Sequence, residues 1–297
     1  MSGDNQPGSR FGAENHHREN YRINDVLSRN RPAIAVHRGS PGGSIVDNTV
    51  AAVKAALRQG ADIVEIDVVR STDGDFFCFH DGYEMHHFGV SQNIRTMSTA
   101  QIEALNYSWA RHSGYPVERL ETMLQQFPDT ILNIDRSWWF WDTLLPFLDQ
   151  RAEVSNILLK APLGEHVKLL TQHATAYPFM PICYSVEEVD EVIRLARTTS
   201  LNLVGLELIA RDSSSPFVSS DYIRELQEQR LFVLANALNL ADCNPLYADM
   251  DDESSVLHDP AQGWGKMAAL GVDVIHTDWP LLLLQHLEGA GYRKGQE

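Results

Sequence analysis

The sequence predicts a single (β/α)₈ barrel of the TIM type, with a short insertion after the second strand and an acidic loop after the seventh. Eight short, nearly continuous apolar runs alternate with amphipathic helical segments along the chain. This alternation is typical of a parallel sheet whose outer face is covered by helices. The chain has 297 residues, and a barrel of eight such units needs roughly 250.

The expected strands are spaced so that a helix fits between most neighbours. In order, they are residues 33–37, 62–68, 130–135, 156–160, 179–184, 202–208, 231–236 and 273–278. Segments such as 48–59 and 186–197 carry apolar residues at helical spacing. An open, doubly wound sheet is the alternative architecture. It is less favoured because no GxGxxG loop follows the first strand.

Two segments depart from the simple repeat. In the insertion, Asp73-Gly74 predicts a hairpin turn, and Ser98 with Gln101 predicts a capping box at the start of a helix. The acidic loop covers residues 241–259. Its run 249–253 lacks the glycine and the spacing of a calcium loop, so we expect these acidic side chains to be solvated.

Composition limits the partners and the compartment. The chain has 40 acidic and 24 basic residues and a formal charge of −16, which argues against nucleic acid and against stable membrane association because like charges repel. Three widely spaced cysteines and the absence of an apolar export segment predict a soluble, cytoplasmic protein. Residues 1–30 read as a polar extension whose first twenty residues are a loose tail, 31–290 as the barrel, and 291–297 as a polar tail.

Charged and chelating side chains gather at the ends of the expected strands. In a barrel these ends open into one shared mouth, where the functional groups lie. The residues concerned are His37, Glu65, Asp67, Asp135, Lys160, Tyr184, Glu207, Asn236 and Asp278. This enrichment predicts a functional site at the mouth.

Three of these residues predict a metal site. Glu65 and Asp67 are two apart on one strand and therefore face the same side, and Asp135 ends the next strand. Oxygen ligands without cysteine suit Mg²⁺ or Ca²⁺, with Mn²⁺ as a further option. The alternative is a structural salt bridge from Glu65 or Asp67 to Arg38 or Arg70, although Arg38 can instead grip a phosphate.

His37 and His80 are the candidates for acid/base catalysis, because imidazole titrates near neutral pH. Asp81 follows His80 and can orient its ring. The adjacent pair His86-His87 also invites a second metal site. On a strand, however, neighbouring side chains point to opposite faces, so we expect these two to be surface histidines.

Several aromatic residues follow strand ends and can line the mouth, where rings stack on a sugar or polyol. They are Trp138, Trp139, Trp141, Tyr184 and Trp279. The alternative is that most of them pack helices onto the barrel.

Taken together, these segments resemble the glycerophosphodiester phosphodiesterase family of metal-dependent barrels. The matching segments are His37-Arg38-Gly39, Asp47-Asn48-Thr49 where the family usually has Glu-Asn-Thr, residues 60–81 and residues 271–280. The resemblance runs from about residue 33 to 288 and is specific because these motifs occur in the family's order.

The resemblance implies roles for individual residues. It implies a divalent cation held by Glu65, Asp67 and Asp135, with His37 and His80 as general base and acid, Arg38 as a phosphate contact, and Asn48 ordering the first loop. The implied reaction is hydrolysis of a small, soluble phosphodiester to an alcohol and a phosphomonoester.

The chain departs from the family at three places. It has Asp135-Arg136-Ser137 where the family has Glu-Ile-Lys, 83–87 replaces a Leu-x-Arg-Thr segment, and 234–239 lacks the family's aromatic residue. Lys160 can reach the phosphate in place of the missing lysine, or it can form an interior salt bridge to Glu207. The predicted substrate-binding residues are Arg38, Lys160, Glu207, Tyr184 and Trp279.

Glycerophosphodiesters are the expected substrate class, and a sugar phosphodiester of the agrocinopine opine type is a variant based on analogy. One alternative is a phospholipase of the sphingomyelinase D type, which would need an apolar rim facing a membrane. The other is a non-catalytic barrel that binds a phosphoester.

Overall fold

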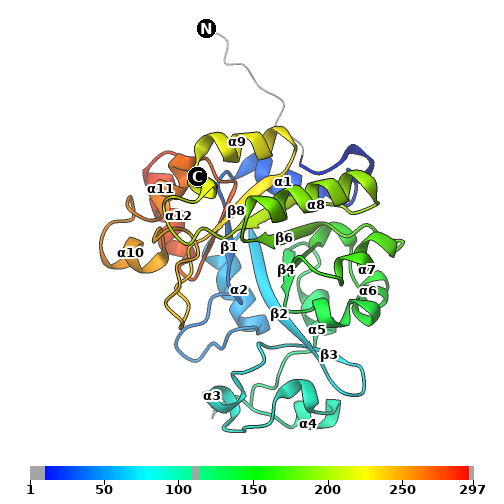
Figure 1. Ribbon diagram of the computed structural model, residues 1–297. Helices are drawn as coiled ribbons and strands as arrows, with labels where there is room; N and C mark the ends of the chain where they lie inside the picture. The colour runs from blue at the N-terminus through cyan, green and yellow to red at the C-terminus, as the bar shows by residue number, and fades with distance from the viewer. Residues whose placement is uncertain (1–10, 109–113, 294–297) are drawn as a thin grey trace.

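The computed structural model describes residues 11–108 and 114–293, and in these residues eight parallel strands close into a barrel (Figure 1). The strands are β1 (Ala33–Val36), β2 (Ile63–Arg70), β4 (Ile131–Asp135), β5 (Ile157–Pro162), β6 (Phe179–Cys183), β7 (Gly205–Leu208), β8 (Phe232–Asn236) and β9 (Val274–Thr277). Each pairs with the next barrel strand, and β1 pairs with both β2 and β9. This closure confirms the predicted barrel and excludes an open sheet.

The register of the strands decides which side chains share a level in the barrel. Asp67 of β2 lies beside Asp135 of β4, and Asn236 of β8 lies beside His276 of β9. Because all eight strands are parallel, their carboxyl ends meet at one end of the barrel. The polar residues expected at strand ends are therefore brought to the same end.

Helices between the strands cover the outside of the barrel (Figure 1). They are α2 (Val50–Arg58), α6 (Trp141–Asp149), α7 (Val167–Gln172), α8 (Val186–Thr198), α9 (Ser220–Glu228), α10 (Asp252–Leu257), α11 (Trp264–Leu270) and α12 (Pro280–Gly289). Hydroxyl groups of Thr49, Ser185 and Ser219 cap α2, α8 and α9 by accepting bonds from backbone N–H groups. In the described residues no helix combines the length and the apolar character needed to cross a bilayer.

The insertion after β2 forms a small substructure at the carboxyl end of the barrel (Figure 1). It contains β3 (Phe76–Cys78), antiparallel to β2, and the helices α3 (Glu84–Phe88) and α4 (Thr99–Glu103). Helix α5 (Leu120–Gln126) follows the insertion and packs on the barrel, where Leu120, Met123 and Leu124 join the hydrophobic core. Gly74 in the hairpin turn has a positive φ of 105°, which glycine adopts readily. The capping box of Ser98 and Gln101 is present at the start of α4, as predicted.

The N-terminal segment packs against the opposite end of the barrel. Helix α1 (Tyr21–Arg29) buries Ile23 and Leu27 there, and Phe11, only 2% exposed, contacts Phe232 edge to face. Asn20 and Asn202 exchange two side-chain hydrogen bonds of 2.9 Å. The expectation of a loose tail is therefore wrong for residues 11–20, while residues 1–10 and 294–297 lie outside the described part of the chain.

Candidate active site

Three carboxylates meet at the carboxyl end of the barrel. One oxygen each from Glu65, Asp67 and Asp135 lies within 4.8 Å of the others. Alternation along β2 places Glu65 and Asp67 on its inner face, and the register with β4 adds Asp135. Glu65 and Asp67 are 1% and 2% exposed, whereas Asp135 is only partly buried. The triad is therefore a group of like charges of which two are withdrawn from water.

Two cations contact this triad. Among the described residues, the proposed alternative salt bridges of Arg38 and Lys160 are present, but no ion pair joins Arg70 to Glu65 or Asp67. The Nε of Arg38 lies 2.8 Å from Asp67 Oδ2, and the backbone N–H of Arg38 donates to Glu65 Oε2 at 2.9 Å. The Nζ of Lys160 lies 2.7 Å from Asp135 Oδ2 and 3.3 Å from Glu207 Oε2. Lys160 of β5 thus links a carboxylate of β4 to one of β7.

The charges of this group do not balance. Its four carboxylates, Glu65, Asp67, Asp135 and Glu207, face two cations, Arg38 and Lys160, which leaves an excess of 4 − 2 = 2 negative charges. Glu65 Oε1 is buried without a hydrogen-bond partner. Burial, and then the charge of Asp67, raises the pKa of Glu65 to about 8. A proton or a cation therefore has to occupy this place, and the donor set fits a hard divalent ion.

Lys160→Met is expected to lower the free energy of unfolding by about 3–5 kcal/mol, because it leaves Asp135 and Glu207 buried without their cation. Urea denaturation measures the change. Lys168→Met removes an ion pair whose lysine is 64% exposed and should change stability by less than about 1 kcal/mol. Equal effects of the two substitutions would contradict the structural role of Lys160.

His37 and His80 both lie near the triad, because each interacts electrostatically with Asp67, but their pKa values shift in opposite directions. The Nδ1 of His37 is 3.0 Å from Asp278 Oδ1. Burial alone would lower the pKa of His37, but Asp278 and Glu65 raise it. Burial lowers the pKa of His80, only partly offset by Asp67. His37 is thus the more readily protonated of the two imidazoles.

The orientation of His80 has a different source from the one expected. Its Nδ1–H donates to the backbone carbonyl of Asp81 at 2.8 Å. The carboxylate of Asp81 instead accepts from Arg136 at 2.8 and 3.1 Å. Arg136 follows Asp135, and the backbone N–H of Arg136 donates to the carboxylate of Asp135 at 2.7 Å. One arginine therefore links the insertion that carries His80 to the end of β4.

The loop after β1 is built around Asp67 and Arg38. Asn48 has a positive φ of 58°; its side chain accepts from the backbone N–H of Asp67 at 2.9 Å and donates to its carboxylate at 3.0 Å. Asp47 lies 3.5 Å from Arg38 and 3.3 Å from His87 Nε2. The placement of His86-His87 on a strand was wrong, since both belong to α3. His86 is exposed, as expected, whereas His87 is buried.

Asp252 is a residue whose position the sequence did not indicate. It lies in the acidic loop yet is 2% exposed, and it accepts hydrogen bonds from Trp264 Nε1, Thr277 Oγ1 and the backbone N–H of Asp278 at 2.7–2.8 Å. The expectation of a fully solvated loop is wrong at this position. Through Asp278, Asp252 holds the partner of His37.

The remaining predicted residues divide between the interior and the rim. Glu207 is 3% exposed and accepts from Asn236 Nδ2 at 2.9 Å, so it lies below the mouth with Lys160. Tyr184, Trp279 and Trp139 are 52%, 49% and 46% exposed at the ends of different strands. Trp141 is fully buried and packs α6 against the barrel, as the alternative held.

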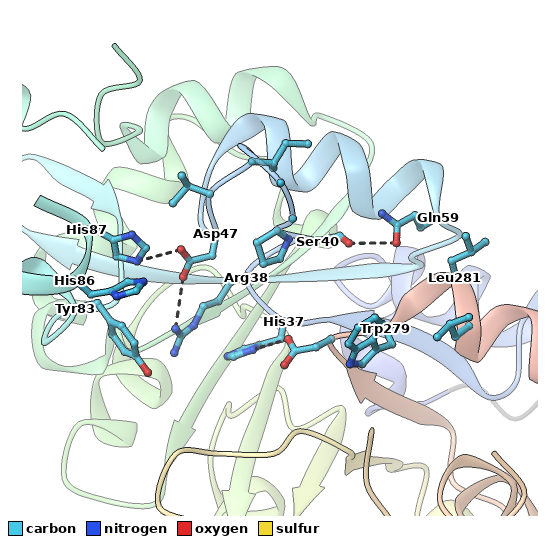
Figure 2. A pocket seen from close by; sticks show the side chains of 17 residues that line it. His37, Arg38, Ser40, Asp47, Gln59, Tyr83, His86, His87, Trp279 and Leu281 are labelled. Carbon is cyan, nitrogen blue, oxygen red and sulfur yellow. Dashed lines mark hydrogen bonds and ion pairs between the residues drawn. The ribbon is translucent and has the colours of Figure 1, made fainter. Parts of the chain in front are cut away.

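A cavity of about 840 Å³ is lined by His37 and by Arg38, which contacts Asp67 of the triad. Figure 2 places His37 and Arg38 between Tyr83, His86 and His87 on one side and Trp279 on the other. The site therefore has room for more than a phosphate group.

The sequence pattern of the glycerophosphoryl diester phosphodiesterase family matches residues 37–282. The chain belongs to this family. The expected class of enzyme, a phosphodiesterase, is thus confirmed at the level of the family. The match includes the predicted His37, the carboxylate triad and Asp278.

Individual relatives agree with this assignment. A probable glycerophosphodiester phosphodiesterase of Mycobacterium tuberculosis is 34% identical over 92 residues, which make up 31% of this chain and 33% of that protein. The alignment thus spans about one third of that relative.

Solved structures support the barrel fold. A phosphodiesterase of Oleispira antarctica, in complex with its product sn-glycerol-3-phosphate, has a TM-score of 0.65 at 19% identity, covering 87% of this chain and 97% of that chain. A glycerophosphoryl diester phosphodiesterase of Parabacteroides distasonis has a TM-score of 0.68 at 15% identity, covering 90% and 92%.

The glycerophosphoryl diester phosphodiesterase family generally depends on divalent metals, and the triad is an acidic group able to hold one. This chain differs from the family in supplying a shorter third carboxylate, Asp135. The ammonium group of Lys160 contacts the carboxylate of Asp135. The metal-ligand role of the triad and the catalytic role of the two histidines stay predictions.

Proposed function

We propose that the protein hydrolyses phosphodiesters, with glycerophosphodiesters as the default class, in a reaction that depends on a divalent cation. The observation that carries this proposal is the carboxylate triad, whose group has two excess negative charges, with His37 and His80 near it. Glu65, Asp67 and Asp135 would hold the ion. When bound, a divalent cation offsets negative charge that develops on phosphoryl oxygens.

The side chains divide the remaining work. Arg38 contributes a fixed positive charge at the inner end of the cavity, where it can contact a phosphoryl oxygen. His80, whose pKa is lowered, accepts the proton of the attacking oxygen. His37, whose pKa is raised, donates a proton to the leaving alcohol oxygen. This assignment reverses the order that the family resemblance implied.

The direct test is hydrolysis of bis(4-nitrophenyl) phosphate by the purified protein with Mg²⁺, Mn²⁺ or Ca²⁺. We expect turnover that EDTA stops and that added metal restores. Activity that persists unchanged in EDTA would contradict metal dependence. No turnover with this or any glycerophosphodiester, for protein that is folded, would favour a non-catalytic binding barrel.

A sugar phosphodiester of the opine type is a second candidate substrate. The observation in its favour is the set of exposed rings at the mouth, Trp139, Tyr184 and Trp279, because aromatic faces stack on sugars. A panel of glycerophospho- and sugar-phosphodiesters, scored by the alcohol released, separates the two classes. A cytoplasmic location and the lack of stable membrane association also stay predictions.

A further inference from the structure

The cavity that adjoins Arg38 has a polar centre and two largely apolar walls. The polar centre includes His37, Arg38 and Asp47, and further polar lining comes from Ser40, Gln59, His86, His87 and Asp278. One wall is the loop after β1, with Pro41, Ile45 and Val46, and the other is the start of α12, with Trp279, Leu281 and Leu282. Figure 2 shows Trp279 and Leu281 across the cavity from the side that carries Tyr83.

Helix α12 carries more leucines at its start than are needed to pack it against the barrel. Leu283 and Leu287 are fully buried and attach the helix to the barrel. Leu281 and Leu282, by contrast, are 44% and 39% exposed and line the cavity. A surface helix normally carries polar residues outside its buried stripe. These two apolar side chains therefore have no packing role that explains their exposure.

The first wall is held in shape by its own backbone. Gly42 and Ile45 exchange backbone hydrogen bonds of 3.1 and 3.0 Å, which form a tight turn. Gly43 at its tip has a positive φ of 59°, a conformation that glycine adopts without strain. Because the turn closes on itself, the wall is formed before any ligand binds.

The cavity adjoins the triad through Arg38 and is larger than a glycerol phosphate needs. Arg38 lines the cavity, and it also contacts Asp67 through Nε and Glu65 through its backbone N–H. A phosphodiester bound at Arg38 can therefore place one of its two ester arms in the cavity. A volume of about 840 Å³ is within the range of pockets that bury drug-sized, mostly apolar ligands.

We infer that this cavity binds an acyl or alkyl chain carried by one alcohol of the phosphodiester. The inference rests on the proposed function and narrows its substrate class. The preferred substrate is then a glycerophosphodiester with one medium-length chain, bound as a single molecule from solution. Apolar contact along the chain favours it over the deacylated compound, since each buried methylene contributes about 0.8 kcal/mol.

The test compares glycerophosphocholine with its octanoyl ester below the critical micelle concentration. We expect kcat/KM to be at least about ten-fold higher for the ester. Leu282→Ser should remove most of this preference. Leu240→Ser is the matched control: Leu240 is 40% exposed, does not line the cavity, and should leave the preference intact.

A second measurement needs no variant. Octyl phosphate should inhibit hydrolysis of bis(4-nitrophenyl) phosphate at least about ten-fold more strongly than glycerol 3-phosphate does. Hydrolysis of glycerophosphocholine without preference for the ester, or equal inhibition by the two phosphates, overturns the inference alone. If the folded wild-type protein hydrolyses none of these phosphodiesters, the result contradicts the proposed function instead. A preference seen only with micelles or vesicles and unchanged by Leu282→Ser would mean that the rim binds a lipid surface, which also overturns the inference.

Discussion

Glu65→Gln is expected to lower turnover of bis(4-nitrophenyl) phosphate by at least about a hundred-fold. Glu65 carries the buried oxygen without a partner, and glutamine keeps the shape but removes one of the two excess negative charges. A site with a smaller negative charge holds a divalent ion less tightly. The substitution should also remove the free-energy cost of burying a charged carboxylate, so the metal-free protein should not lose stability.

Metal binding can be measured separately from activity. A ligand that binds only the folded protein at a hundred times its Kd stabilises it by about 2.7 kcal/mol, so Mn²⁺ should raise the Tm of the wild-type protein but not of Glu65→Gln. The control is Glu187→Gln, which alters an exposed glutamate on α8. If Glu65→Gln keeps both the activity and the thermal shift, the triad is not the metal site.

His80→Ala and His37→Ala are each expected to lower turnover of glycerophosphocholine by about a hundred-fold or more. The two variants should differ with an activated substrate. Nitrophenolate leaves without a proton, so loss of the general acid matters little for bis(4-nitrophenyl) phosphate. His37→Ala should therefore retain much of its activity on that compound, whereas His80→Ala should be impaired on both.

His258→Ala serves as the control, because His258 is exposed after α10 and away from the cavity. The reverse pattern, with His80→Ala selectively sparing the activated substrate, would restore the order of roles that the resemblance implied. Full activity of either variant on glycerophosphocholine would remove that histidine from the mechanism.

The sequence predicted the barrel strands well because their signal is local. Each strand is a short apolar run, and burial on both sides makes these runs nearly continuous. The triad was also predictable, because alternation along β2 fixes the side of Glu65 and Asp67, and the next strand brings Asp135 beside them.

Other positions depend on contacts between distant segments. Asp252 appears solvated in the sequence, but Trp264 and Thr277 surround it only after the barrel closes. Likewise, nothing local indicates that Phe11 packs against Phe232. His87 was misplaced for another reason, since the short helix α3 lacks the length that makes helical periodicity visible.

The apolar layer at the amino end of the barrel limits how molecules can move through the protein. Ile63, Ile131 and Phe232 fill the interior there, and α1 covers it from outside. In the described part of the chain, the barrel is thus open to substrate at one end only. For the proposed reaction, the substrate enters and both products are released through the same opening. With the octanoyl ester of glycerophosphocholine, release of the product that keeps the chain is expected to be slower than bond cleavage, and rapid mixing would reveal an initial burst of the other product.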